Sequence, residues 1–278
     1  LLNYAKTLMR VPMGVFGAAM AYAAYPTLAR LFAQGRTAEL RGALASAIER
    51  VLLLAFASQV ILTAGGPEIG TLVYTARRIP PADLETLGLY LSLFSVGLPA
   101  WSLQILLSRG FYARRRAWLP TWLGTGIMVL FVPVYWQMGE RFGGAGLAVT
   151  SALAISTYAL LLAALLHREL DREERGAAAG PGAQGESDGS PRRPARRTVW
   201  FAARGLAACL AGTAAGLWAA RLLGAPATTA AGALGRLFII GGAGTAVYGA
   251  VAAATGILPV ARALAAFSRR RGRGANGN

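Results

Sequence analysis

Long apolar stretches alternate with short arginine-rich segments along this chain. A helix needs roughly 20 apolar residues to cross the hydrocarbon core of a bilayer. Seven stretches meet that need, at about 11–29, 49–66, 87–108, 117–138, 144–166, 199–222 and 232–258. The pattern predicts an all-α fold: a polytopic membrane helix bundle of about seven transmembrane helices, preceded by a short N-terminal helix end.

Two segments break this pattern. Residues 171–198 are rich in Gly, Pro, Ser and charge and contain almost no large apolar side chain, which predicts a flexible linker. Residues 261–278 form a basic tail whose arginines can rest on anionic lipid. We therefore expect a five-span bundle over 1–170, the linker over 171–198, two further transmembrane helices over 199–260, and the tail.

The composition supports a membrane protein. Charged residues make up 14% of the chain, against roughly 25% in an average soluble domain. The net charge of +16 would favour a nucleic-acid binder in a soluble protein, but the charges here are confined to short blocks between apolar stretches. The positive-inside rule explains such an excess without nucleic acid, which we do not expect as a partner.

The basic residues divide unequally between the two sides that seven crossings define. One side holds 21 of the 28, and the other holds Lys6, Arg10, Arg77, Arg78, Arg141, Arg221 and Arg236. The richer side is expected to be cytoplasmic, which places the C-terminus inside the cell.

The chain carries no recognisable catalytic constellation. The lone Cys209 lies in an apolar stretch, and the lone His167 has no cluster of Cys, His or carboxylates around it in the sequence. We expect neither an enzyme nor a cofactor or metal, and an ion gradient or the membrane potential is the candidate driving force. A transporter needs no catalytic set, because it works by moving helices around a site.

The arginines near the spans are the candidate binding residues. Lys6 and Arg10 precede the first span, and Arg30 ends it. Arg204 and Arg236 lie just inside the last two spans, where we expect them to snorkel to the nearer interface.

The stretch RGFYARRRAWLP at 109–120 joins two spans. Its aromatic residues suit a membrane interface, and its arginines suit an anionic headgroup level. On physical grounds it is chiefly a loop that sets orientation. A contact from Arg109 or Arg114 to a lipid pyrophosphate is the alternative, because the guanidinium fork fits phosphate.

The same stretch resembles the "aFYA…tP" signature of the lipid II flippase family (MurJ, also called MviN), part of the multidrug and polysaccharide exporter superfamily. Three further segments are similar to segments of that family in order and spacing: NYAKTLMRVPMGVFGAAMAYAAYPTLAR, YLSLFSVGLPAWSLQILLSRGFYARR and FGGAGLAVTSALA. The resemblance covers about residues 1–170, and the last two spans agree in number, position and orientation.

This resemblance implies a bacterial inner-membrane protein of fourteen helices in two lobes, with two extra C-terminal helices that form a groove for lipid. The chain would correspond to the end of the seventh helix and to helices eight to fourteen. The family moves lipid II, the polyprenyl-pyrophosphate-linked peptidoglycan precursor, to the outer leaflet for cell-wall synthesis and cell shape. It does so by alternating access around a central cationic cavity.

The chain departs from the family at one important position. Thr7 stands where the "YAdRL" segment has a cavity arginine, so that Lys6 or Arg10 would have to supply the charge. The first lobe is also absent, and a lone second lobe is not expected to flip lipid. Either the chain is a fragment or a partner chain supplies the other half. The expected substrate-binding residues are Lys6, Arg10, Arg30, Arg109 and Arg114.

Two alternatives of function remain open. The missing cavity arginine motivates an exporter of another polyprenyl-linked glycan. The basic linker and the missing lobe motivate a membrane scaffold that transports nothing and binds partners through residues 171–198.

Overall fold

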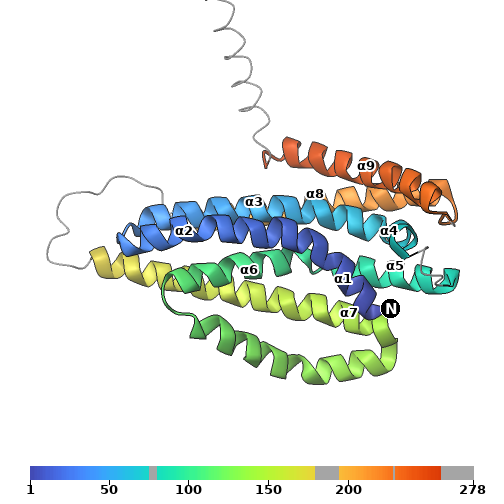
Figure 1. The fold of residues 1–278 in the computed structure, drawn as a ribbon. Coiled ribbons are helices and arrows are strands. Elements are labelled where there is room, and N and C mark those ends of the chain that lie inside the picture. Colours follow the sequence, from blue (N-terminus) through green and yellow to red (C-terminus); the bar gives the residue numbers. More distant parts are fainter. Residues whose placement is uncertain (75–79, 179–193, 228, 258–278) are drawn as a thin grey trace, which may run out of the picture.

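The computed structural model describes residues 1–74, 80–178, 194–227 and 229–257, and every element within these ranges is a helix (Figure 1). The all-α prediction is confirmed. In chain order the helices are α1 (Leu2–Pro12), the π-helix η1 (Met13–Ala18), α2 (Ala19–Ala33), α3 (Thr37–Ala64), α4 (Gly66–Tyr74), α5 (Pro81–Ser95), α6 (Leu98–Ala113), α7 (Trp118–Ala178), α8 (Pro194–Leu223) and α9 (Ala230–Ala254).

Within the described ranges, four helices are long and apolar enough to cross a membrane. They are α3, α7 over Trp118–Glu173, α8 over Thr198–Leu223, and α9. A fifth crossing results if α5 and α6 form one span, since their axes differ by 44° at the break between them. The chain is therefore a multi-pass membrane protein, as the hydropathy pattern predicted.

Helix α7 contains two of the predicted spans. It reverses at Gly143, whose φ of 55° and ψ of −135° lie outside helical values and favour glycine. The two halves then pack as a hairpin. The Tyr158 hydroxyl donates to the carbonyl oxygen of Pro120 at 2.9 Å, and the Tyr135 hydroxyl lies 3.0 Å from the Ser151 hydroxyl.

The first predicted span lies on the continuous run α1–η1–α2. Residues expected as a short N-terminal helix end form α1, which continues directly into the span through η1. The amphipathic stretch before the second span is likewise part of one 28-residue helix, α3. Within the described ranges, each of the seven predicted spans falls mainly on helix, and the one predicted at 87–108 is broken between α5 and α6.

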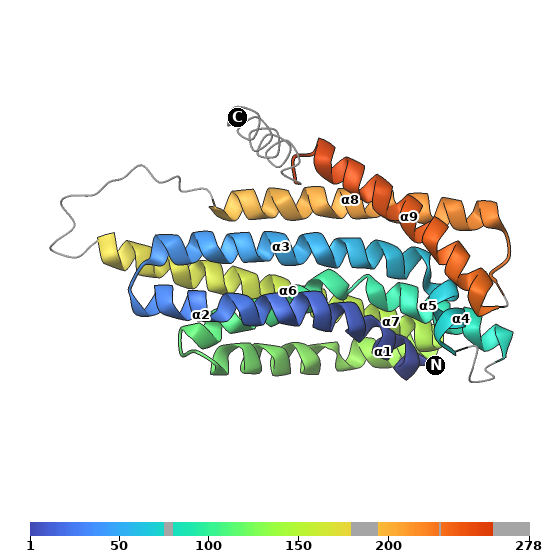
Figure 2. The same cartoon turned by 45° about the horizontal axis from the view of Figure 1, so that its top comes forward.

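The helices run side by side, and the connections alternate between the two ends of the bundle (Figures 1 and 2). One end, at the left of both views, holds the α2–α3 and α6–α7 turns, the end of α7 and the start of α8. The other end holds the N-terminus, α4, the reversal of α7 and the α8–α9 connection. We call these the basic end and the opposite end, because the arginine-rich turns gather at the first.

Two buried apolar clusters hold the bundle together. The larger joins α2, α3, α6, α7 and α8 and includes Leu106, Phe111, Leu162 and Leu166, each at most 1% exposed. The smaller lies at the opposite end around Met9, Leu87, Leu91 and Leu98. In a membrane such close packing replaces the hydrophobic effect as the force that joins helices.

The last two helices pack closely on α3 through small residues. A Cβ atom added to Gly212 of α8 would lie 2.7 Å from the carbonyl oxygen of Gly244 of α9. A Cβ atom added to Gly216 would lie 2.6 Å from Cβ of Ala64 of α3. Gly212 and Gly216 form a small-xxx-small pair of the kind that lets transmembrane helices approach closely.

Arg236, which was expected to snorkel to the nearer interface, forms an ion pair and reaches the end of α8. Its Nε donates to Oε1 of Glu68 on α4 at 3.1 Å, and the Glu68 side chain is 3% exposed. Its other two nitrogens donate to the carbonyl oxygens of Leu223 and Gly224 at the end of α8. The buried Glu68 carboxylate thereby gains a charged partner, and two carbonyls at the end of α8 gain a donor.

Helix occupies both ends of the segment expected as a linker. Helix α7 continues through Ala178 and α8 begins at Pro194. The middle of that segment, residues 179–193, and the basic tail at 261–278 lie outside the described residues.

Candidate substrate-binding face

Polar side chains lie on the exposed side of α1 and of α2, before and after the apolar η1. Thr7, Arg10 and Arg30 are exposed, and Tyr22 is 60% exposed. Arg109 of α6 reaches the same side, because its guanidinium carbon lies 4.4 Å from the centre of the Tyr22 ring. We call these five residues the cationic face.

The π-helix η1 sets the register of this face. Arg10 and Tyr22 are twelve positions apart, which would turn them by about 120° from each other in a regular α-helix. A π turn joins residues five apart rather than four, and it therefore accommodates one extra residue. With η1 between them, the angle between Arg10 and Tyr22 about the helix axis falls to about 20°. Both side chains therefore project to one side.

Arg10 is better placed than Lys6 to supply the charge that the family resemblance led us to expect at Thr7. Arg10 lies three positions after Thr7, and residues three apart share a helix face. Lys6 is adjacent to Thr7 in sequence, is turned by about 100° from it, and is half-buried. The hydroxyl of Thr7 itself donates to the carbonyl oxygen of Asn3 at 2.8 Å, a bond internal to α1.

The cations of the face have no carboxylate beside them. Within the described part of the chain, neither Arg10 nor Arg30 nor Arg109 forms an ion pair, and the same holds for Lys6. Arg109 is half-buried and lies between two rings, since its guanidinium carbon is also 5.6 Å from the centre of the Tyr112 ring. Arginine on an aromatic face keeps its N–H edge available for an anion.

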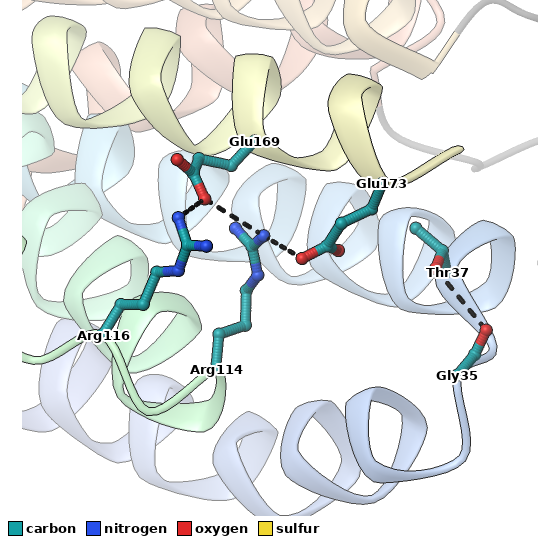
Figure 3. Close-up of polar contacts among 6 residues, drawn as sticks. All are labelled: Gly35, Thr37, Arg114, Arg116, Glu169 and Glu173. Atoms are coloured by element: carbon teal, nitrogen blue, oxygen red, sulfur yellow. Dashed lines mark hydrogen bonds and ion pairs between the residues drawn. The ribbon is translucent and has the colours of Figure 1, made fainter. Parts of the chain in front are cut away.

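Three other arginines at the basic end are paired with acids of α7, and Figure 3 shows two of them, Arg114 and Arg116. Arg114 is 5% exposed and contacts both Glu169, at 3.3 Å, and Glu173. Arg116 also pairs with Glu169 (Figure 3). On α3, Arg41 donates to Asp171 at 2.7 Å.

The structure therefore separates the five residues expected from the sequence to bind substrate. Arg10, Arg30 and Arg109 share the exposed face, whereas Lys6 lies at its edge. Arg114 is buried against two carboxylates, away from this exposed face. Sequence reasoning missed Tyr22 and Tyr112, whose ring faces become informative only once α2 and α6 are placed together.

In the described ranges, no group of three or more His, Cys, Asp or Glu side chains is placed to hold a metal ion.

The cationic face places arginines near both ends of a helix that is long enough to cross a membrane. About 20 residues separate Arg10 from Arg30, which corresponds to about 30 Å of helix, the thickness of a bilayer core. Guanidinium groups in such a row can bind the phosphates of a lipid at successive depths.

The fold and this face define a multi-pass helix bundle that carries cations on one exposed side. The family model described as "Lipid II flippase MurJ" matches residues 1–179, and the chain belongs to that family. It is thereby a multi-pass protein of the bacterial inner membrane. The matched region includes the whole cationic face and ends just beyond α7.

Curated relatives agree with this assignment. A "Probable lipid II flippase MurJ" of Rhizobium tropici is 29% identical over 174 residues, 60% of this chain and 31% of the relative. Proteins of the same description from Vibrio cholerae and Rhizobium meliloti are 26% identical over 217 residues (78% of this chain, 38% of the relative) and 27% identical over 165 residues (59% and 31%). The chain spans about a third of the length of the curated relatives it matches.

Proposed function

We propose that this chain supplies part of a lipid II flippase and that its cationic face binds the pyrophosphate of the lipid-linked precursor during passage between leaflets. The observation that carries this proposal is the alignment of Arg10, Arg30 and Arg109 on one exposed side of a membrane-length helix, with no acid paired to them in the described ranges. Membership of the lipid II flippase family supports the choice of substrate.

The basic end of the bundle is the cytoplasmic end in this proposal. The arginine-rich turns gather there, and 21 of the 28 basic residues fall on that side of the seven predicted spans. Arg30 and Arg109 then lie near the inner leaflet, and Arg10 lies toward the outer one. A fluorescent protein fused to the C-terminus should fluoresce in the cell, whereas a periplasmic location would leave it dark.

The precursor passes along the face from cation to cation. Its pyrophosphate is the costly group to place in the membrane, and arginines spaced along the helix offset that cost. Arg10 replaces the arginine that the family has at the position of Thr7, one turn of helix earlier. No cofactor is needed, and an ion gradient or the membrane potential drives the cycle.

The cationic face is exposed on one side, so further protein can cover it and enclose a path for the substrate. Relatives are about three times as long as the match, so the rest of the transporter supplies that cover, either in the same polypeptide or as a partner chain. The activity is transport of a lipid-linked substrate rather than catalysis.

The test is depletion of the protein in its own cells, with the exposure of lipid II on the outer leaflet as the readout. Outer-leaflet lipid II should fall while the inner-leaflet pool accumulates. Restoring the intact gene should reverse both changes, and a variant with Arg10 and Arg109 changed to Ala should restore neither. Unchanged outer-leaflet exposure after depletion would overturn the proposal.

A different polyprenyl-linked glycan is the second candidate, because Thr7 replaces the cavity arginine. Both substrates share the polyprenyl pyrophosphate and differ in the sugar. Rescue of a glycan-export mutant, with lipid II exposure unaffected by depletion, would favour this second substrate.

A further inference from the structure

We propose that Arg109, stacked on Tyr22 and flanked by Tyr112, is a preorganised binding site for a lipid-borne phosphate at the basic end of the bundle. The inference rests on the proposed function for the identity of the lipid. The site itself is argued from contacts alone and can be tested without transport.

The stacking fixes the orientation of the guanidinium. Arg109 comes from α6 and Tyr22 from α2, and the guanidinium carbon lies 4.4 Å from the Tyr22 ring centre. Tyr112, one turn further along α6, approaches from a second direction at 5.6 Å. An arginine held this way loses less side-chain entropy on binding than a freely rotating one, because its rotamer is already chosen.

The stack also leaves the arginine available to a ligand. The Arg109 side chain has no hydrogen bond or ion pair to any other residue in the described ranges, and Tyr22 beside it is 60% exposed. The N–H groups at the edge of the guanidinium plane can therefore point away from the rings. Two parallel N–H groups match two oxygens of a phosphate, a bidentate contact that lysine cannot make.

Two neighbouring arginines, Arg114 and Arg116, differ from Arg109 because acids hold them. Five positions later, Arg114 is buried against Glu169 and Glu173. Arg116 is paired with Glu169. Acids of α7 thus hold two arginines of the α6–α7 turn. Arg109 instead lies against the rings of Tyr22 and Tyr112.

The position of the site fits a lipid headgroup. Arg109 lies near the end of α6, one turn before the turn at 114–117, and the exposed Trp118 and Trp122 begin the next span. Tryptophan at the end of a span marks the interface of a bilayer. A phosphate at that level belongs to a membrane lipid. The pyrophosphate of a polyprenyl lipid carries a larger negative charge than the single phosphate of an ordinary phospholipid.

The experiment measures the binding of farnesyl pyrophosphate to the full chain in nanodiscs of neutral phosphatidylcholine. Arg109→Ala should weaken binding about tenfold, which is the typical loss of one charge-assisted contact. Arg109→Lys should weaken it to a similar extent, because lysine lacks the fork. Tyr22→Ala should weaken it about threefold, and Tyr22→Phe should not, since a phenyl ring keeps the stack.

The matched control is Arg115→Ala, which removes the same charge from an exposed arginine in the adjacent turn. Thermal unfolding of each variant shows whether the fold is intact. Equal weakening by Arg115→Ala and Arg109→Ala would reduce the effect to net charge and overturn the site. Full binding by Arg109→Lys would overturn the bidentate contact on which the site is argued.

Two further arms separate the sources of phosphate. Phosphatidylglycerol added to the nanodiscs should compete only weakly for farnesyl pyrophosphate, and inorganic pyrophosphate should bind more weakly than the lipid-linked form. Strong competition by phosphatidylglycerol would keep the phosphate site but assign it to bulk lipid. If Arg109→Ala weakens binding while depletion leaves lipid II exposure unchanged, the site stands and the proposed function fails.

Discussion

Arg109 and Arg114 lie five positions apart in one basic stretch, yet the structure gives them opposite surroundings. Arg109 faces two tyrosine rings on the open side of the bundle, with no acid paired to it in the described ranges. Arg114 is buried and contacts two glutamates of α7. The comparison teaches that the elements packed around an arginine, rather than the density of charge in the sequence, decide whether it binds a ligand or holds the fold.

The same division extends to the rest of the molecule. Arg41 and Arg236 are each paired with an acid from another helix, Asp171 and Glu68 respectively. Those pairs join α3 to α7 and α9 to α4, and they hold helices in place. The arginines of the cationic face form no ion pair within the described ranges, which leaves them open to a substrate in the proposed function.

The largest effect is expected when the buried arginine is lost. Arg114→Met leaves Glu169 and Glu173 without their shared partner, and we expect a loss of about 2 kcal/mol, or about 30-fold in the unfolding equilibrium. The loss is smaller than for a wholly buried pair because the Glu173 side chain is 34% exposed. Arg109→Met removes the same charge and should leave the unfolding midpoint in detergent nearly unchanged. Equal losses for the two variants would remove the distinction.

The second effect concerns the register of the cationic face. Deleting Val15 from η1 should convert the π-helix to a regular α-helix and keep Arg10 and Tyr22 about 20° apart. Deleting Ala23 from the regular α2 should instead rotate Arg30 by about 100° relative to Tyr22. Lipid II exposure in cells that carry only the variant should fall about tenfold or more for the second deletion and little for the first. The opposite ranking would contradict the role assigned to η1.

The smallest effect concerns which residue replaces the missing cavity arginine. Arg10→Ala should lower lipid II exposure about fivefold, because one of several charge-assisted contacts is lost. Adding Thr7→Arg should restore most of it, since positions 7 and 10 share a face. Lys6→Ala serves as the matched control, with a smaller effect because Lys6 is half-buried at the edge of the face. Failure of Thr7→Arg to restore exposure would separate this chain from its family at that position.

Much of the fold follows from the sequence alone. The apolar stretches located the long apolar helices found in the described ranges, because a bilayer imposes both length and composition on a span. The reversal of α7 is marked by Gly-Gly at 143–144 between two apolar stretches, which the sequence predicted as a loop between two spans. The π-helix η1 has no comparable signal, since Met13–Ala18 is apolar throughout and reads as ordinary span.

The candidate site was only half accessible to sequence reasoning. The residue types and positions singled out Arg10, Arg30 and Arg109, because cations near apolar spans are costly and therefore informative. The partners of Arg114 and Arg236 lie 55 to 168 positions away in the chain, a separation that only the tertiary fold resolves. The sequence placed Asp171 and Glu173 in a charged linker, whereas the structure places both on α7, where they pair with Arg41 of α3 and Arg114.

The most direct measurement of the central claim is photo-cross-linking of radiolabelled lipid II to the protein in membranes. A benzophenone amino acid placed at Val11, beside Arg10 on the exposed side of α1, should form a labelled adduct, and Arg10→Ala should weaken that adduct. The same amino acid at Trp122, which is equally exposed but on the first half of α7, should form little adduct. Labelling at Trp122 that equals labelling at Val11 and ignores Arg10 would contradict the claim that the cationic face carries the substrate.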